Sequence, residues 1–78
     1  MKRDEAIALL KKIAESERFG FNWISLVNGK FGCEIHIKPE QGSDPSVLKH
    51  IFEKRDLKMK ETKGTLVIYR EHGESQEL

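Results

Sequence analysis

This 78-residue sequence has one cysteine, two prolines and no long apolar run. The lone Cys33 cannot form a disulfide within the chain, which excludes a disulfide scaffold and favours a reducing, cytoplasmic setting. No run approaches the roughly 20 apolar residues of a membrane-spanning helix, and the first residues lack the apolar stretch of a secretory signal. We therefore expect a cytoplasmic protein with no membrane partner.

An excess of charge of one sign is also lacking. The chain has 14 Lys and Arg against 13 Asp and Glu, a net charge of +1, which is too mild for a dedicated duplex-DNA binder. Residues 71–78 hold three acids, no Lys or Arg and almost no apolar content, so residues 1–70 carry +4. We expect a single compact domain over 1–70 and a flexible acidic C-terminal tail over 71–78.

Two segments show apolar residues at helical spacing. The first predicts an amphipathic helix over 4–18, with Gly20 as its stop. The second begins at Asp44-Pro45-Ser46, where an N-cap acid precedes a proline at the first helical position. Aromatic and β-branched residues predict strands over 21–27, 31–38, 57–60 and 65–70.

The resulting element order is α-β-β-α-β-β, typical of an α+β domain. We expect two helices packed on one face of a four-stranded antiparallel sheet, with the other face open to solvent. The pattern leaves the order of the strands in the sheet undetermined.

The first hairpin admits two registers. A two-residue Asn28-Gly29 loop pairs Phe21 with His36 and Trp23 with Glu34 on the open face. A three-residue loop with Gly29 as a bulge shifts the pairing by one residue and turns both aromatic side chains into the core. The second strand has a clear core face in either case, formed by its apolar alternate positions: Phe31, Cys33, Ile35 and Ile37.

The second hairpin has a simpler pattern. A Lys63-Gly64 turn pairs Met59 with Ile68 and places Val67 and Tyr69 beside lysines. In the exposed register, aromatic and basic side chains then share the open face, and we take these as candidate binding residues: Phe21, Trp23, His36, Lys38, Lys58, Lys60 and Tyr69.

No motif predicts chemistry. Cys33 and His36, three apart on a strand, point to opposite faces, and the chain has no paired Cys/His spacing of a zinc site. Gly29-Lys30 precedes a strand, whereas a phosphate loop precedes a helix. Ser25 has no histidine or acid that the sequence positions beside it. We expect no metal, no cofactor and no enzymatic activity.

The sequence therefore predicts a small non-catalytic domain. We expect a protein-interaction or self-associating module that uses the open sheet face, with a protein partner or a homodimer. The alternative is a weak single-stranded nucleic acid binder, because bases stack on aromatic rings while ammonium groups meet phosphates.

Overall fold

The computed structural model describes residues 1–29, 32–53 and 55–70. The acidic tail predicted over 71–78 and the core position predicted for Phe31 lie outside the described residues. The elements follow the predicted order: α1 (Arg3–Ala14), β1 (Phe21–Gly29), β2 (Gly32–Pro39), α2 (Ser46–Glu53), β3 (Lys58–Thr62) and β4 (Thr65–Tyr69).

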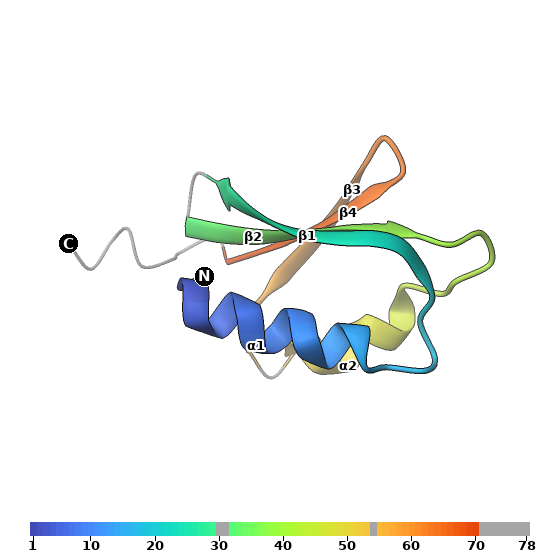
Figure 1. Ribbon diagram of the computed structural model, residues 1–78, viewed down its shortest axis with the longest axis horizontal. Coiled ribbons are helices and arrows are strands. Elements are labelled where there is room, and N and C mark those ends of the chain that lie inside the picture. Colours follow the sequence, from blue (N-terminus) through green and yellow to red (C-terminus); the bar gives the residue numbers. More distant parts are fainter. Residues whose placement is uncertain (30–31, 54, 71–78) are drawn as a thin grey trace.

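The sheet has the strand order β1-β2-β4-β3, and every neighbouring pair is antiparallel. Both helices lie on the same side of it, below the sheet in the view of Figure 1. This confirms the predicted fold class. Among the described residues, neither helix has the length and apolar character needed to cross a membrane.

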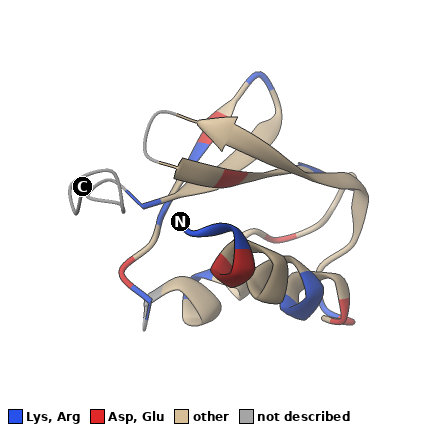
Figure 2. Ribbon diagram, turned by 60° about the vertical axis from the view of Figure 1, so that its left-hand side comes forward, with Lys and Arg blue, Asp and Glu red and all other residues tan. Residues whose placement is uncertain are grey.

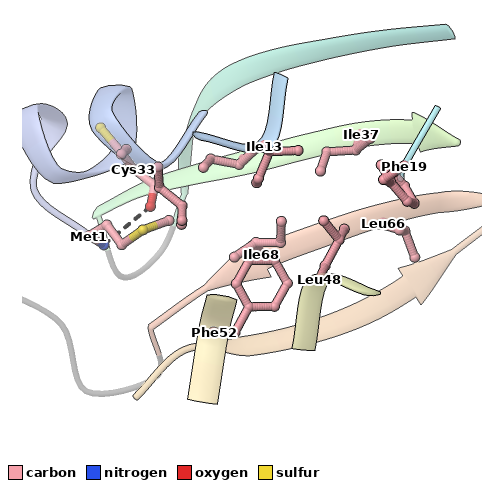
Figure 3. Close-up of a cluster of buried hydrophobic side chains, with 12 residues drawn as sticks. Met1, Ile13, Phe19, Cys33, Ile37, Leu48, Phe52, Leu66 and Ile68 are labelled. Carbon is pink, nitrogen blue, oxygen red and sulfur yellow. Dashed lines mark hydrogen bonds between the residues drawn. The ribbon is translucent and has the colours of Figure 1, made fainter. Parts of the chain in front are cut away.

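The core fills the space between the helices and the two central strands. Ile35 and Ile37 of β2 and Ile68 of β4 are completely buried. Their side chains meet the apolar stripes of the helices, as Figure 3 shows for part of the cluster. The helical contribution comes from residues at helical spacing: Ala6, Leu9, Ile13, Leu48 and Phe52. Burial of this apolar surface holds the helices on the sheet.

Helix α1 ends at Ala14, four residues before the predicted end. The stripe that ends in Ile13 would continue at Ser16 and Glu17, which have nothing apolar to bury. The Ser16 N–H donates to the Ile13 carbonyl at 3.1 Å, a tightened last turn. The chain then leaves the helix and inserts Phe19 into the core.

Helix α2 begins as predicted. The Ser46 N–H donates to Asp44 Oδ1 at 3.0 Å, so Asp44 caps the helix. A hydrogen bond from the Ser46 side chain, joined by the one from its backbone, holds the pKa of the Asp44 carboxyl below its ordinary value.

The predicted loop of the first hairpin is wrong in both registers. Strand β1 continues through Asn28, which pairs with Cys33, and Gly29, which pairs with Gly32. Residues 28 and 29 are therefore paired strand residues and do not form the loop. Relative to the two-residue loop, the partners of residues 23–27 all move by four positions, an even number, so these side chains keep their faces. Ile24 and Leu26 lie on the core side, as that register predicts.

Phe21 is a correction to the predicted open face. The pairing shifts between Phe21 and Trp23, where a bulge inserts Asn22, so Phe21 pairs with Pro39 and packs against the core. Trp23, beyond the bulge, pairs with Lys38 and remains on the open face.

The second hairpin is confirmed residue by residue. Met59 pairs with Ile68, and Thr62 pairs with Thr65 around a two-residue turn. Lys63 and Gly64 both have positive φ, 52° and 81°, as a type I′ turn requires.

The first residue of the chain completes the sheet beside β2. The Cys33 N–H donates to the Met1 carbonyl at 2.8 Å. The Met1 ammonium donates to the Cys33 carbonyl at 3.2 Å, the hydrogen bond dashed in Figure 3. Met1 thus sits next to β2 beyond the end of β4, and only 1% of it is exposed.

Candidate binding surface on the open face of the sheet

The open face is the side of the sheet turned away from both helices. The strand registers arrange its side chains in rows across the strands. The central row runs Ser25, His36, Val67, Lys60. Trp23 and Lys38 stand beside it on one side, and Val27 with Glu34 and Tyr69 with Lys58 stand on the other.

A shallow depression of about 430 Å³ lies in this face. Its floor is Val67, which is only 6% exposed because its neighbours' side chains cover it. The remaining lining residues come from all four strands and the β3–β4 turn: Trp23, Glu34, His36, Lys60, Thr62, Lys63 and Thr65. The depression is thus built from every strand of the sheet.

Trp23 forms the aromatic wall of the depression. Its exposure of 46% makes it the one large hydrophobic residue among those described that stands exposed. It has Lys38 as its cross-strand neighbour. A planar group entering the depression can therefore meet the face of an indole.

Lysines bound the opposite side. The Lys60 ammonium lies over the Tyr69 ring, 5.2 Å from the ring centroid, in cation–π geometry. Lys38 extends across the face until its ammonium lies against Gly64. Together with Lys58 and Lys63, these residues form an arc of positive charge from the end of β2 to β3.

One acid interrupts the positive charge. Glu34 Oε1 lies 3.0 Å from His36 Nε2, and both side chains are partly buried, at 17% and 26% exposure. The Glu34 side chain occupies the space over Gly29 that a Cβ atom there would fill. Glycine at 29 thus makes room for the carboxylate, and the histidine holds it at one end of the depression.

Ser25 lies opposite His36 in the ladder. A hydroxyl, an imidazole and a carboxylate therefore occupy neighbouring positions. However, His36 Nε2 faces Glu34, and Ser25 is not among the residues that line the depression. A nucleophile needs a base within hydrogen-bond reach, and no such bond joins Ser25 to His36 among the described side chains.

The predicted site residues fall into three groups. Trp23, His36 and Lys60 meet around the depression. Lys38, Lys58 and Tyr69 lie on the same face around it, whereas Phe21 belongs to the core. Within the described part of the chain, no cluster of three or more His, Cys, Asp or Glu residues could hold a metal ion.

Lys63 and the threonines Thr62 and Thr65 were not predicted as part of the site. Their sequence signal was that of a turn, which carries no indication that the turn rises beside a depression. Comparison of the chain with protein-family models, curated proteins and solved structures found no match.

Proposed function

We propose that this protein is a non-catalytic binding domain and that its open sheet face takes a single-stranded nucleic acid. The observation that carries the proposal is the depression walled by exposed Trp23 on one side and by Lys60 and Lys63 on the other. Aromatic platforms flanked by lysines suit single strands because every base has a ring face to stack and every linkage a phosphate to neutralise.

The sign of the charge favours this ligand over face-to-face self-association. Four lysines surround the depression, and the one acid beside it, Glu34, is held by His36. Two open faces laid against each other would bring lysine arcs together, which costs free energy. A polyanion meets the same surface with opposite charge.

In the proposed complex, one base stacks on Trp23 above Val67, and the adjoining phosphates lie towards Lys60 and Lys63. The threonine hydroxyls at the edge of the depression offer hydrogen bonds to the base or to the phosphates. The pattern contains no set of base-reading groups in fixed geometry, so the expected binding is weak and tolerant of sequence.

The test is a titration of the protein with a single-stranded oligonucleotide of about 12 nucleotides, followed by Trp23 fluorescence at several salt concentrations. The double variant Lys60→Gln/Lys63→Gln is expected to bind more weakly. Its slope of log affinity against log salt should be smaller by about 1.4, the value for two lost phosphate contacts on a single strand.

The matched control is Lys11→Gln/Lys12→Gln, which removes the same charge from exposed positions on α1, on the other side of the molecule. If both double variants lose the same affinity, binding follows net charge alone and the proposed surface is wrong. Binding to an acidic polypeptide with no response to the oligonucleotide would instead identify a protein-interaction module.

We also propose a cytoplasmic location. A nucleic acid ligand requires that compartment or an equivalent one, and the unpaired, buried thiol of Cys33 is compatible with its reducing conditions.

A further inference from the structure

Strand β1 forms one edge of the sheet, and it carries no charged residue and no proline along its nine residues, Phe21–Gly29. In Figure 2 the strand is drawn without blue or red along its length. Exposed edges present unpaired N–H and C=O groups, and monomeric proteins commonly protect them with lysine, proline or a bulge. The single bulge of β1 lies at its first residues, so the stretch from Trp23 onward is unprotected.

The free backbone groups of this edge can be assigned from the ladder. Cys33 uses both its N–H and its C=O on Met1, so it does not exchange bonds with its partner Asn28. Pairs alternate between bonded and non-bonded along an antiparallel ladder. Ile24 and Leu26, two and four residues before Asn28, therefore also direct their N–H and C=O groups away from β2, towards the free edge.

We propose that β1 is the interface between two copies of this chain, which pair antiparallel about Ser25 and join their sheets into one sheet of eight strands. In this register Ile24 of one copy lies opposite Leu26 of the other. Both residues direct their backbone groups outward, so the two symmetric pairs form four hydrogen bonds.

The side chains of β1 are self-complementary in this register. On the open face Trp23 lies opposite Val27 of the second copy, and on the core side Ile24 lies opposite Leu26. Aromatic and β-branched pairs of this kind stabilise antiparallel strands. Shifting the centre by one residue in either direction places Trp23 opposite Ser25 or Gly29, which loses the aromatic pair.

The partial burial of Ile24 and Leu26 also supports a second copy of β1 as the partner of this edge. Both pack against the core yet remain partly exposed at the edge, whereas the core-facing residues of the central strands β2 and β4 are almost fully buried. A second copy of β1 would cover them. The pairing also leaves both depressions open on the same side, so the inference does not depend on the ligand proposed for them.

The test places charge at the two-fold axis. In the dimer, Ser25 lies directly opposite Ser25 of the other copy, so Ser25→Lys and Ser25→Glu each bring like charges together. Each variant alone is expected to raise the dimer dissociation constant at least about tenfold, measured by sedimentation equilibrium without nucleic acid. In the monomer the new side chain extends from the open face into solvent.

An equimolar mixture of the two variants is expected to restore the dimer, because lysine then faces glutamate. Glu61→Lys, which places a lysine on the opposite edge strand β3 and outside the depression, should leave dimerisation unchanged. A wild-type chain that stays monomeric at every concentration, or a mixture that fails to re-form the dimer although circular dichroism shows both variants folded, would overturn the proposal. Either outcome leaves the oligonucleotide titration unaffected.

Discussion

The two edges of the sheet are built in opposite ways. At one edge β1 is nine residues long and uncharged, and at the other β3 is five residues long and carries Lys58, Lys60 and Glu61. The N-terminal end of α2 also lies close to β3, since Asp44–Ser46 and Met59–Glu61 line one surface depression. The charges of β3 therefore serve two purposes, because they discourage strand pairing at that edge and provide cations to the open face.

The β3 side is further secured by the last described residue. Arg70 donates from Nη1 to Glu5 Oε1 at 2.6 Å and from Nη2 to Glu5 Oε2 at 2.5 Å, and also to the Arg55 carbonyl at 2.8 Å. This bidentate contact links the end of β4 to α1 and to the segment that leads into β3. Four experiments test how far the two edges differ.

Truncating Ile35, at the centre of the sheet, should have the largest effect on stability. Ile35 is completely buried and pairs with Leu26 on one side and Ile68 on the other, so Ile35→Ala is expected to lower the free energy of unfolding by about 2–5 kcal/mol. Urea unfolding measures this loss. Because Ile35 belongs to neither edge, the loss should be the same at low and high protein concentration.

Removing the Arg70 side chain should have the second largest effect on stability. Arg70→Ala is expected to cost about 1–2 kcal/mol, a value reduced for the partial exposure of the pair, 20% for Arg70 and 33% for Glu5. Arg70→Lys should recover little of it, since an ammonium cannot make the two parallel bonds. Full recovery by lysine in thermal unfolding would show that charge alone matters at this position.

At the β1 edge the cost should depend on concentration. Leu26→Ala is expected to lose about 1 kcal/mol in dilute solution, because the side chain is only half buried in the monomer. At concentrations where the proposed dimer forms, the loss should grow, since the wild type gains stability by association. A loss that is constant across a dilution series would mean that both edges are equally unpartnered.

The smallest effect is expected at the cap of α2, the helix beside β3. The pKa of Asp44 is lower in the folded chain than in the unfolded chain, so its ionised form stabilises the fold at pH values above its unfolded pKa. That contribution disappears as the pH falls through the folded value. The difference in melting temperature between the wild type and Asp44→Ala should therefore be present at neutral pH and shrink in acid. A difference that grows in acid would contradict the cap.

The contrast between the two hairpins explains what the sequence could predict. In the second hairpin, the turn signal and the alternation of residue types predict the same register. The structure has that register, with Thr62 and Thr65 paired on either side of Lys63-Gly64. In the first, Asn28-Gly29 is a strong local turn signal, yet both residues are paired within the strand. The backbone of Cys33 is hydrogen-bonded to Met1, which lies 32 positions away in the sequence. No local sequence pattern can reveal a contact of that kind.

The candidate site was predicted only in part for the same reason. Of the two registers that the sequence left open, the one with a two-residue loop placed Trp23, His36 and Lys60 on one face, and the observed register keeps them there because it differs by an even number of residues. Phe21 was misplaced because the bulge beside it has no signature in Asn22. The depression depends on the twist and spacing of four strands, which the sequence pattern of a single strand does not contain.

The bond between Met1 and Cys33 gives the protein a built-in reporter of local opening. Cys33 carries the only thiol in the chain, it is buried, and its backbone holds the start of the chain in place. Solvent deuterium can exchange with the Cys33 N–H when the N-terminal segment lifts from β2 or when the whole domain unfolds, because either event breaks its hydrogen bond to Met1. The exchange rate of this one amide, compared with the rate of global unfolding, therefore reports how often the first residues of the chain detach.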